Sequence, residues 1–306
     1  MGLAEIKAAE FDLEKTLNCG QVFHWEKSGN GYVGAIGDTA AYVEQRGERL
    51  LFTGVTAKTI AHYFSLDHSL AEICRSFPND PAMSAAKEFC RGLRIIRQPL
   101  WECLATFICS SMKQVAHIRQ ISLALRRHFG GRKIIYGSHV YAFPSAKRLA
   151  LTSDKELRGC ALGYRAKNLL GTAQLVATGK APLERWRTLS DQELRENLCR
   201  LPGVGAKVAN CVMLFAYERS RAFPIDVWIE RVLREQYFPR KRKLGVRQLR
   251  EFCDDYFGEH GGYAQQYLFH HARSTRRAAR ARQVVRPPDV RYDLAVKRRA
   301  AAPPQP

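Results

Sequence analysis

The sequence predicts an α+β protein in which an N-terminal antiparallel β-sheet domain precedes a mainly α-helical domain that contains a helix-hairpin-helix. Short runs of β-branched and aromatic residues, separated by glycine-rich turns, occupy residues 21–54. From about Pro81 the apolar residues recur with a helical period instead. The segment LPGVGAKVANC, residues 201–211, places a proline and two glycines between two helical patterns, which indicates a helical hairpin.

The β-rich segment reads QVFHWEKSGNGYVGAIGDTAAYVEQRGERLLFTG. Ser-Gly-Asn-Gly, Gly-Asp and Arg-Gly-Glu interrupt its apolar runs, and such residues are typical of tight turns. This spacing predicts a meander of antiparallel strands, and we expect the β-rich domain to comprise residues 1–85.

Helices are expected over residues 86–285. One of them is predicted to end at Gly130, because four apolar residues before it share a helical face: Val115, Ile118, Ile121 and Leu125. Capping boxes that begin at Ser153 and Ser190 predict helices that open near residues 154 and 191. Beyond Arg286 the chain is rich in proline, alanine and arginine, so we expect residues 286–306 to form a basic, poorly ordered tail.

The composition indicates a nucleic-acid partner. The chain has 306 residues, of which 46% are hydrophobic, and this is enough to bury a core. Its 49 Lys and Arg residues outnumber 29 Asp and Glu residues, which gives a net charge of +20. A charge of this size and sign attracts phosphate groups, so the composition favours DNA or RNA binding.

The nine cysteines contain no Cys-x-x-Cys pair, no Cys and His cluster at zinc spacing, and no run of four that would hold an iron–sulfur cluster. We therefore expect reduced thiols, no metal and no other cofactor. The N-terminus lacks the pattern of a secretory signal, and no apolar run is long enough to span a bilayer. These features predict a soluble monomer without membrane association, cytoplasmic in a bacterium and associated with the nucleoid.

The predicted hairpin suits the DNA backbone. A helix that starts at Ser190 ends near Pro202, the chain turns through Gly203 and Gly205, and a second helix starts at Ala206. The glycines let the backbone approach a phosphate closely, and the first N–H groups of the second helix can bind it without reading sequence. An ordinary αα-hairpin with a glycine turn is the alternative.

Lys207 and Asp226 are candidate catalytic residues. Taken singly, Lys207 is a further phosphate contact and Asp226 is the N-cap of a helix that begins at Val227. Taken together, they suit chemistry at a sugar carbon. Burial and the positive end of the helix dipole both favour the neutral, nucleophilic amine of Lys207, whereas the dipole holds the Asp226 carboxylate ionised. The amine would attack the anomeric carbon, release a base and leave a Schiff base, from which β-elimination cleaves the strand; the carboxylate would stabilise positive charge on the sugar.

These residues resemble those of the helix-hairpin-helix, Gly/Pro-Asp superfamily of DNA glycosylases. LPGVGAKVANC followed by FPIDVW is similar to its central motif. CGQVFHW (19–25), FICSS (107–111), LGYRAK (162–167) and GGYAQQYLF (261–269) resemble the 8-oxoguanine DNA glycosylase branch. The likeness covers roughly residues 10–275, and the five segments agree in order.

The resemblance implies a role for each matching residue. Lys207 corresponds to the nucleophile and Asp226 to the assisting carboxylate. The carbonyl of Gly20 corresponds to the acceptor for an imidazole-ring N–H that 8-oxoguanine has and guanine lacks. An unpaired buried carbonyl costs about 1–3 kcal/mol, so this contact would separate the two bases.

Three further residues match the pocket for the extruded base. Cys211 and Phe269 correspond to the residues that sandwich it, and Gln265 to the residue that reads its pairing edge. Without the resemblance, Cys211 and Phe269 would be interpreted as core residues, Gln265 as a surface residue and Gly20 as a turn.

Base flipping requires a residue that fills the vacated space. Tyr164 matches the wedge of this family, and Arg165 matches an arginine that contacts the opposite base. Animal members carry asparagines after Ser-Ser and an arginine a few residues later, whereas this chain has Met112 and His117 in this region. Neither side chain can donate two parallel hydrogen bonds to a base as arginine does, so we expect weak discrimination among opposite bases.

Trp228 stands where many relatives carry a phosphate-contacting histidine, so that contact is in doubt and the indole either stacks or packs.

The resulting prediction is a base-excision repair glycosylase with AP lyase activity that removes 8-oxoguanine and related oxidised purines from double-stranded DNA. One alternative is a monofunctional glycosylase for alkylated bases (3-methyladenine type), in which the aspartate acts with water and no lysine is needed. The other is a non-catalytic helix-hairpin-helix DNA-binding module. Borohydride trapping distinguishes them, because only a Schiff base is reduced to a covalent protein–DNA bond.

Overall fold

The structure, a computed structural model, describes residues 2–111, 113–240 and 245–284, with side chains to Arg276. Residues 1–272 form one compact unit and residues 273–306 a second. Met112 and the predicted tail at 286–306 lie outside the described residues. The predicted domain boundaries at residues 85 and 285 stay predictions.

The predicted α+β class and the N-terminal meander are confirmed. Five antiparallel strands form one sheet in the order β1-β5-β4-β3-β2. Each hairpin turn between β2 and β5 contains a glycine with positive φ, at Gly29, Gly37 and Gly47. The strands are β1 (Ala4–Lys7), β2 (Glu26–Ser28), β3 (Gly31–Ile36), β4 (Thr39–Arg46) and β5 (Arg49–Thr53).

Three short helices that the sequence analysis did not predict lie in the β-rich region: α1 (Leu13–Asn18), α2 (Ala57–Tyr63) and α3 (Leu70–Arg75). Each has a side-chain N-cap, from Asp12, Thr56 and Ser69. Six or seven residues are too few to display a helical period, which is why the sequence pattern missed them. Apolar residues of α1 and α2 pack with those of β4 and β5 in one core cluster.

The opposite face of the sheet carries a second hairpin that the sequence analysis did not predict. It consists of β6 (Arg132–Ile135) and β7 (Ser138–Tyr141), and its turn residues Tyr136 and Gly137 both have positive φ. The ring of Tyr136 stacks on Tyr42 of β4 at 3.9 Å between centroids. The part of the chain beyond Pro81 is thus mainly helical, as expected, with one hairpin of two four-residue strands that tertiary packing on the sheet stabilises.

The rest of the described chain is helical, as predicted. The capping boxes at Ser153 and Ser190 are both present, and the helix predicted before Gly130 ends there. The helices are α4 (Pro81–Phe89), α5 (Leu100–Cys109), α6 (Val115–Phe129), α7 (Ala146–Ala150), α8 (Asp154–Gly159), α9 (Arg165–Ala177), α10 (Asp191–Cys199), α11 (Ala206–Phe215), α12 (Val227–Val232), α13 (Val246–Tyr256) and α14 (Gly261–Val284), with single turns at Arg185–Thr188, Leu233–Tyr237 and Gly258–His260.

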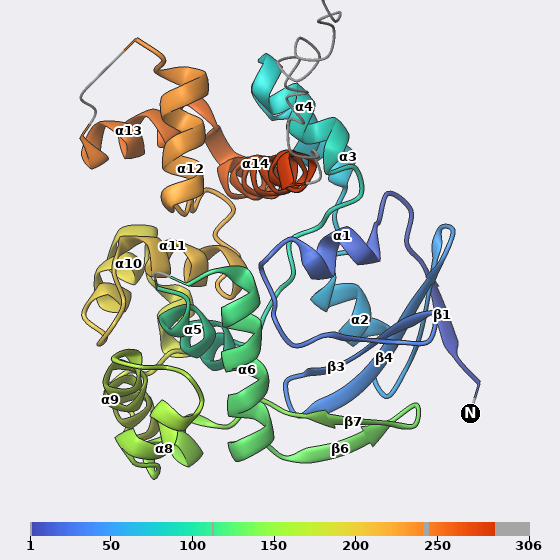
Figure 1. Cartoon of the computed structure of the whole chain (residues 1–306), viewed down its shortest axis with the longest axis vertical. Coiled ribbons are helices and arrows are strands. Elements are labelled where there is room, and N and C mark those ends of the chain that lie inside the picture. Colours follow the sequence, from blue (N-terminus) through green and yellow to red (C-terminus); the bar gives the residue numbers. More distant parts are fainter. Residues whose placement is uncertain (1, 112, 241–244, 285–306) are drawn as a thin grey trace, which may run out of the picture. The chain divides into compact units, whose positions relative to one another are not determined.

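Helix α5 forms the centre of the helical part. Every residue from Glu102 to Cys109 is buried, and α5 packs against α6, α9 and α11. A helix that is apolar on all sides is stable only when other elements surround it. In Figure 1, the strands β3, β4, β6 and β7 lie on one side of α6, and helices α8, α9 and α10 lie on the other.

A buried ionic network joins α5 and α6 to the sheet. The Arg126 guanidinium on α6 pairs with the Glu102 carboxylate on α5 and donates to the carbonyl of Tyr141 at 3.0 Å. His24 lies 3.5 Å from the same carboxylate and hydrogen-bonds the Ala35 carbonyl of β3 at 2.8 Å. Burial raises the pKa of Glu102, which Arg126 opposes, whereas burial and the Arg126 charge both lower the pKa of His24; the Glu102 carboxylate therefore depends on Arg126 for its charge, and His24 is neutral.

We expect Arg126→Met to lower the free energy of unfolding by about 3–5 kcal/mol, because it leaves the Glu102 carboxylate buried without its cation. The double variant Glu102→Leu/Arg126→Met removes both charges and is expected to lose much less. Urea unfolding of both variants tests this. Arg158→Met is the control, since Arg158 forms an exposed pair with Asp154 and its loss is expected to cost under about 1 kcal/mol. Equal losses in Arg126→Met and Arg158→Met would contradict the expectation.

Candidate active site

The hairpin between α10 and α11 has the predicted geometry. Gly203 adopts a φ of +79°, and a Cβ at this residue would lie 2.7 Å from the Cβ of Asn168 on α9. Thr172 of α9 donates to the Pro202 carbonyl at 3.0 Å and holds the turn in place. Gly205 is exposed and is the N-cap of α11, where it offers no side-chain acceptor to the first-turn N–H groups. This helix start is therefore open to an anion.

Lys207 lies in the first turn of α11 and is held by the last turn of α5. Its Nζ donates to Ser110 Oγ at 3.2 Å and lies 5.1 Å from the ring centroid of Phe107. Ser110 Oγ donates its own hydrogen to the Phe107 carbonyl at 2.7 Å. The serine oxygen thus acts only as an acceptor toward the lysine, whatever the charge on the amine.

Asp226 is the N-cap of α12, as predicted. Its Oδ1 accepts hydrogen bonds from the backbone N–H groups of Trp228 at 3.0 Å and Ile229 at 2.9 Å. Burial raises the pKa of Asp226, and these hydrogen bonds and the nearby Lys207 cation offset the rise only in part. The sequence analysis considered the helix dipole but not desolvation, which acts in the opposite direction and is the larger effect on this pKa.

Cys211 lies one turn after Lys207 and is buried. Burial raises the pKa of its thiol to about 11, with Lys207 acting against the rise and Asp226 adding to it. The structure thus brings Lys207, Asp226 and Cys211 within electrostatic reach of one another.

Helix α14 presents the other two predicted base-binding side chains. Gln265 is 4% exposed, which excludes its interpretation as a surface residue. Its Oε1 has no hydrogen-bond partner among the described residues. Phe269 follows one turn later and packs, half-buried, against the main core cluster. A buried amide oxygen without a partner is unfavourable, so Gln265 is suited to a donor from outside the chain.

Gly20 lies in the loop after α1 and has a φ of +95°. Gln266 of α14 donates to the neighbouring Cys19 carbonyl at 3.2 Å, so this loop adjoins the helix that carries Gln265. Three residues later in the same loop, the Phe23 ring packs edge-on against Phe107 at 6.1 Å between centroids. Phe107 in turn faces Lys207, which links the loop to the lysine.

Tyr164 and Arg165 have contrasting environments. Tyr164 is 54% exposed and immediately precedes α9. Arg165 is 4% exposed, donates from Nε to the Ser111 carbonyl at 2.8 Å and contacts the Leu162 carbonyl at 3.3 Å. Its guanidinium lies 4.3 Å from the centroid of the Tyr164 ring. In this structure Arg165 therefore fixes the segment after α5, and its predicted contact with DNA stays a prediction.

The structure gives mainly the exposure of the remaining residues predicted to lie near DNA. His117 is exposed in the first turn of α6, and Met112 lies outside the described residues. Trp228 is half-buried, with the Arg231 guanidinium 6.0 Å from its ring centroid.

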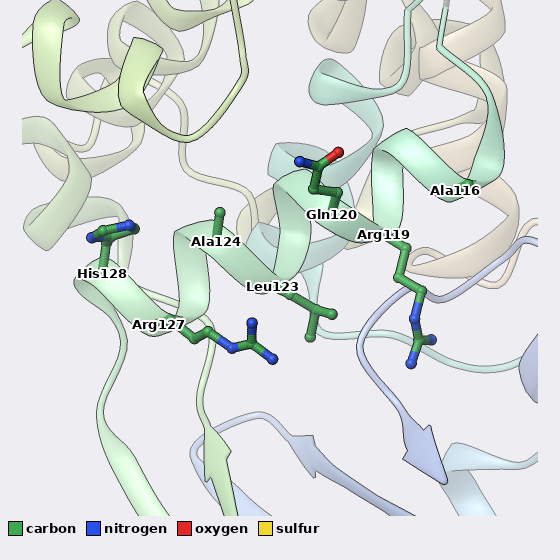
Figure 2. A pocket seen from close by; sticks show the side chains of 7 residues that line it. All are labelled: Ala116, Arg119, Gln120, Leu123, Ala124, Arg127 and His128. Carbon is green, nitrogen blue, oxygen red and sulfur yellow. The ribbon is translucent and has the colours of Figure 1, made fainter.

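A hollow of about 430 Å³ runs along α6. Figure 2 shows its side chains spread to both sides of the helix. None of them is a predicted site residue: Ala116, Arg119, Gln120, Leu123, Ala124, Arg127 and His128. With two arginines and no acid, this hollow forms part of the basic surface rather than of the Lys207 site.

Ser110 and Gln266 were not singled out from the sequence. Ser110 was present in the FICSS segment, but its contact with Lys207 spans 97 residues of sequence and has no local signal. Within the described residues, no helix is long and apolar enough to cross a bilayer, and no three His, Cys, Asp or Glu side chains group as metal ligands would.

Comparison with known proteins gives consistent matches. Residues 4–104 match the N-terminal domain of 8-oxoguanine DNA glycosylase. The N-glycosylase/DNA lyase OGG1 of Arabidopsis thaliana is 33% identical over 286 residues, which cover 85% of this chain and 77% of the plant protein. The 8-oxoguanine glycosylase/lyase of Clostridium acetobutylicum, solved with double-stranded DNA containing cytosine opposite 8-oxoguanine, has a TM-score of 0.84 and 30% identity over 90% of this chain and 98% of that one. A 3-methyladenine DNA glycosylase from Archaeoglobus fulgidus shares the fold, with a TM-score of 0.75 over 89% of this chain and 98% of that one. Its sequence identity is 18%.

We expect Lys207→Met to raise the pKa of Asp226 further, because the lysine charge opposes the effect of burial. Carbon-detected NMR titration of the Asp226 carboxyl measures this shift. Lys167→Met removes an exposed lysine of α9 and serves as the control, for which no change is expected. An Asp226 pKa that is unchanged or lower in Lys207→Met would show that the two groups do not interact.

Proposed function

This chain belongs to the 8-oxoguanine DNA glycosylase family, and we propose that Lys207 and Asp226 carry out its base excision and strand cleavage. Its activity is that of an N-glycosylase/DNA lyase in 8-oxoguanine repair. The observation that carries the assignment is the placement of the Lys207 amine, which is held by Ser110 Oγ at 3.2 Å and lies near the Asp226 carboxylate. An alkylated-base glycosylase that relies on aspartate and water would have no use for an amine held in this way.

The hairpin supplies the grip on DNA in this proposal. The open N-terminus of α11 binds a phosphate through its N–H groups, and Gly203 and Gly205 allow the close approach. The exposed ring of Tyr164 enters the base stack while the damaged nucleotide leaves it, a step that costs a few kcal/mol. Backbone contacts of this kind position the duplex but do not read its sequence.

The chemistry begins with the neutral amine of Lys207. Its lone pair forms a bond with C1′ of the deoxyribose as the bond from C1′ to the base breaks and the base takes the electron pair. Ser110 Oγ accepts an N–H of the amine and so leaves the lone pair directed elsewhere. Asp226, held by two backbone N–H groups, stabilises the positive charge that develops on the sugar ring.

Strand cleavage follows from the covalent intermediate. The sugar ring opens to a Schiff base between Lys207 and C1′. Loss of a proton from C2′ then expels the 3′ phosphate, and water releases the lysine. Asp226 also takes the proton that Lys207 must lose before attack and passes it to the departing base, which returns the carboxyl to its ionised form; the two groups interact electrostatically.

Base recognition uses the second group of residues. The side chains of Cys211 and Phe269 sandwich the extruded base, and the unpaired Gln265 Oε1 accepts a hydrogen bond from its pairing edge. The Gly20 carbonyl accepts the imidazole-ring N–H that distinguishes 8-oxoguanine from guanine. We further propose that the protein acts as a monomer in the cytoplasm of a bacterium; its nine free cysteines support the reducing compartment of this proposal.

Lys207→Gln is expected to abolish borohydride cross-linking to a duplex with one 8-oxoguanine and to slow base release roughly 10³-fold or more, because the nucleophile is lost. Gel analysis of trapped complexes and of released base measures both effects. Lys167→Gln, on the exposed face of α9, is the matched control and is expected to trap normally. Cross-linking that survives in Lys207→Gln assigns the nucleophile elsewhere. Base release by the wild type without trapping indicates a monofunctional enzyme, and neither activity indicates a binding module.

We expect the wild type to excise 8-oxoguanine opposite cytosine and opposite adenine at rates within about tenfold of each other. The exposed His117 cannot donate the pair of hydrogen bonds that an arginine would give to the opposite base. His117→Arg should then favour cytosine by a further factor of about 5–150, the range of one good bidentate contact. Single-turnover rates on matched duplexes test both statements. Gln120→Arg, which adds the same charge one turn further along α6, is the control. A wild-type rate a hundredfold faster opposite cytosine contradicts the proposal.

A further inference from the structure

The loop that carries Gly20 is held by three buried glutamines, one of its own and two from distant parts of the chain. Gln266 of α14 donates from Nε2 to the Cys19 carbonyl at 3.2 Å. Gln98, which precedes α5, donates from Nε2 to the Gln21 carbonyl at 2.8 Å. Gln21 itself donates to the carbonyls of Thr16 at 3.0 Å and Arg94 at 2.8 Å, and accepts from the Ile96 N–H at 2.8 Å. None of the three glutamines is more than 7% exposed.

The three successive carbonyls of Cys19, Gly20 and Gln21 therefore differ in hydrogen bonding. Those of Cys19 and Gln21 each accept a hydrogen bond from a glutamine amide. Among the described residues, none donates to the Gly20 carbonyl between them. Gly20 is half-buried, and an acceptor left unpaired between two paired carbonyls is the arrangement expected where a ligand binds.

The direction of the Gly20 carbonyl depends on its neighbours. Glycine at a φ of +95° has no Cβ to restrict its backbone, so the local chain alone does not determine where this carbonyl points. Each peptide unit is planar, and fixing the carbonyls of Cys19 and Gln21 fixes the peptide planes on either side. Gln266 and Gln98 thus restrain the peptide group between Gly20 and Gln21, which contains the Gly20 carbonyl.

We propose that Gln266 and Gln98 are specificity-determining positioning residues that hold the Gly20 carbonyl in place, so that it accepts the imidazole-ring N–H of 8-oxoguanine and opposes the bare ring nitrogen of guanine. This inference rests on the proposed function of Gly20. A carbonyl held in this direction cannot turn away from guanine, and two facing acceptors repel each other. A carbonyl free to rotate would lose the hydrogen bond to the lesion and tolerate the normal base.

The side-chain hydrogen bonds of Gln266 and Gln98 go to the Gly20 loop and not to Lys207, so we expect their effect to be confined to steps that involve the base. Cleavage at an abasic site uses Lys207 and Asp226 but contains no base to recognise. The comparison between an 8-oxoguanine duplex and an abasic duplex therefore separates positioning of the Gly20 carbonyl from general damage to the fold.

The test uses the full-length variants Gln266→Met and Gln98→Met, which keep much of the side-chain volume and remove the amide donor. Single-turnover excision of 8-oxoguanine opposite cytosine is expected to fall about tenfold or more in each, while abasic-site cleavage stays within about twofold of the wild type. The preference in binding for the 8-oxoguanine duplex over the undamaged duplex should shrink in parallel.

Gln45→Met is the matched control. The Gln45 amide also donates to backbone carbonyls, of Phe11 at 2.6 Å and Gly47 at 3.0 Å, but its contacts lie at the start of α1 and at the β4–β5 turn and include none of the carbonyls of Cys19, Gly20 or Gln21. Its two activities should keep the wild-type ratio even if stability falls.

Three results would overturn the inference. Equal losses of 8-oxoguanine excision and abasic-site cleavage in Gln266→Met and Gln98→Met would assign both residues a purely structural role. Unchanged excision and binding preference in both variants would show that the Gly20 carbonyl needs neither amide. A wild type that cleaves abasic sites but leaves 8-oxoguanine in place would refute the proposed function itself, and the inference with it.

Discussion

The hydrogen bond from Lys207 Nζ to Ser110 Oγ joins the two helices on which the chemistry depends. It connects the start of α11, where the hairpin meets DNA in our proposal, to the end of α5, which is buried along almost its whole length. Because α5 cannot shift without disturbing the helical core, the amine is held against one of the most deeply buried helices. The phosphate grip and the nucleophile thus share one helix, and the core determines where that helix begins.

Burial at this site acts against charge, and the surrounding groups compensate unequally. Asp226 receives two backbone hydrogen bonds and the field of Lys207, yet burial still raises its pKa. Cys211 is buried one turn after half-buried Lys207, and burial raises its thiol pKa to about 11, which keeps the sulfur uncharged. The site therefore contains few charged groups, chiefly Lys207 and Asp226. A carboxylate placed in this way can stabilise the positive charge that develops briefly on a sugar ring.

Features with a local cause were predictable from the sequence. The capping boxes at Ser153 and Ser190 depend on residues three positions apart, and the meander depends on glycines at its turns, so both could be recognised without a structure. The β6–β7 hairpin and the short helices near the N-terminus could not. Two four-residue strands become stable only where Tyr136 stacks on Tyr42 of the sheet, and that partner lies far away in the sequence. For the site, Asp226 as an N-cap and Lys207 in a first turn were predictable for the same local reason, whereas the burial of Arg165 was not.

The sequence by itself determined the order of the elements, the basic charge, the hairpin and, through resemblance, the family to which the chain belongs, because spacing and composition carry that information over short ranges. Only the tertiary structure decided which groups surround the candidate reactive atoms. Ser110 reaches Lys207 across 97 residues, and Gln266 reaches Cys19 across 247. Such contacts arise from the packing of whole helices around a shared core, and no pattern among neighbouring residues records them.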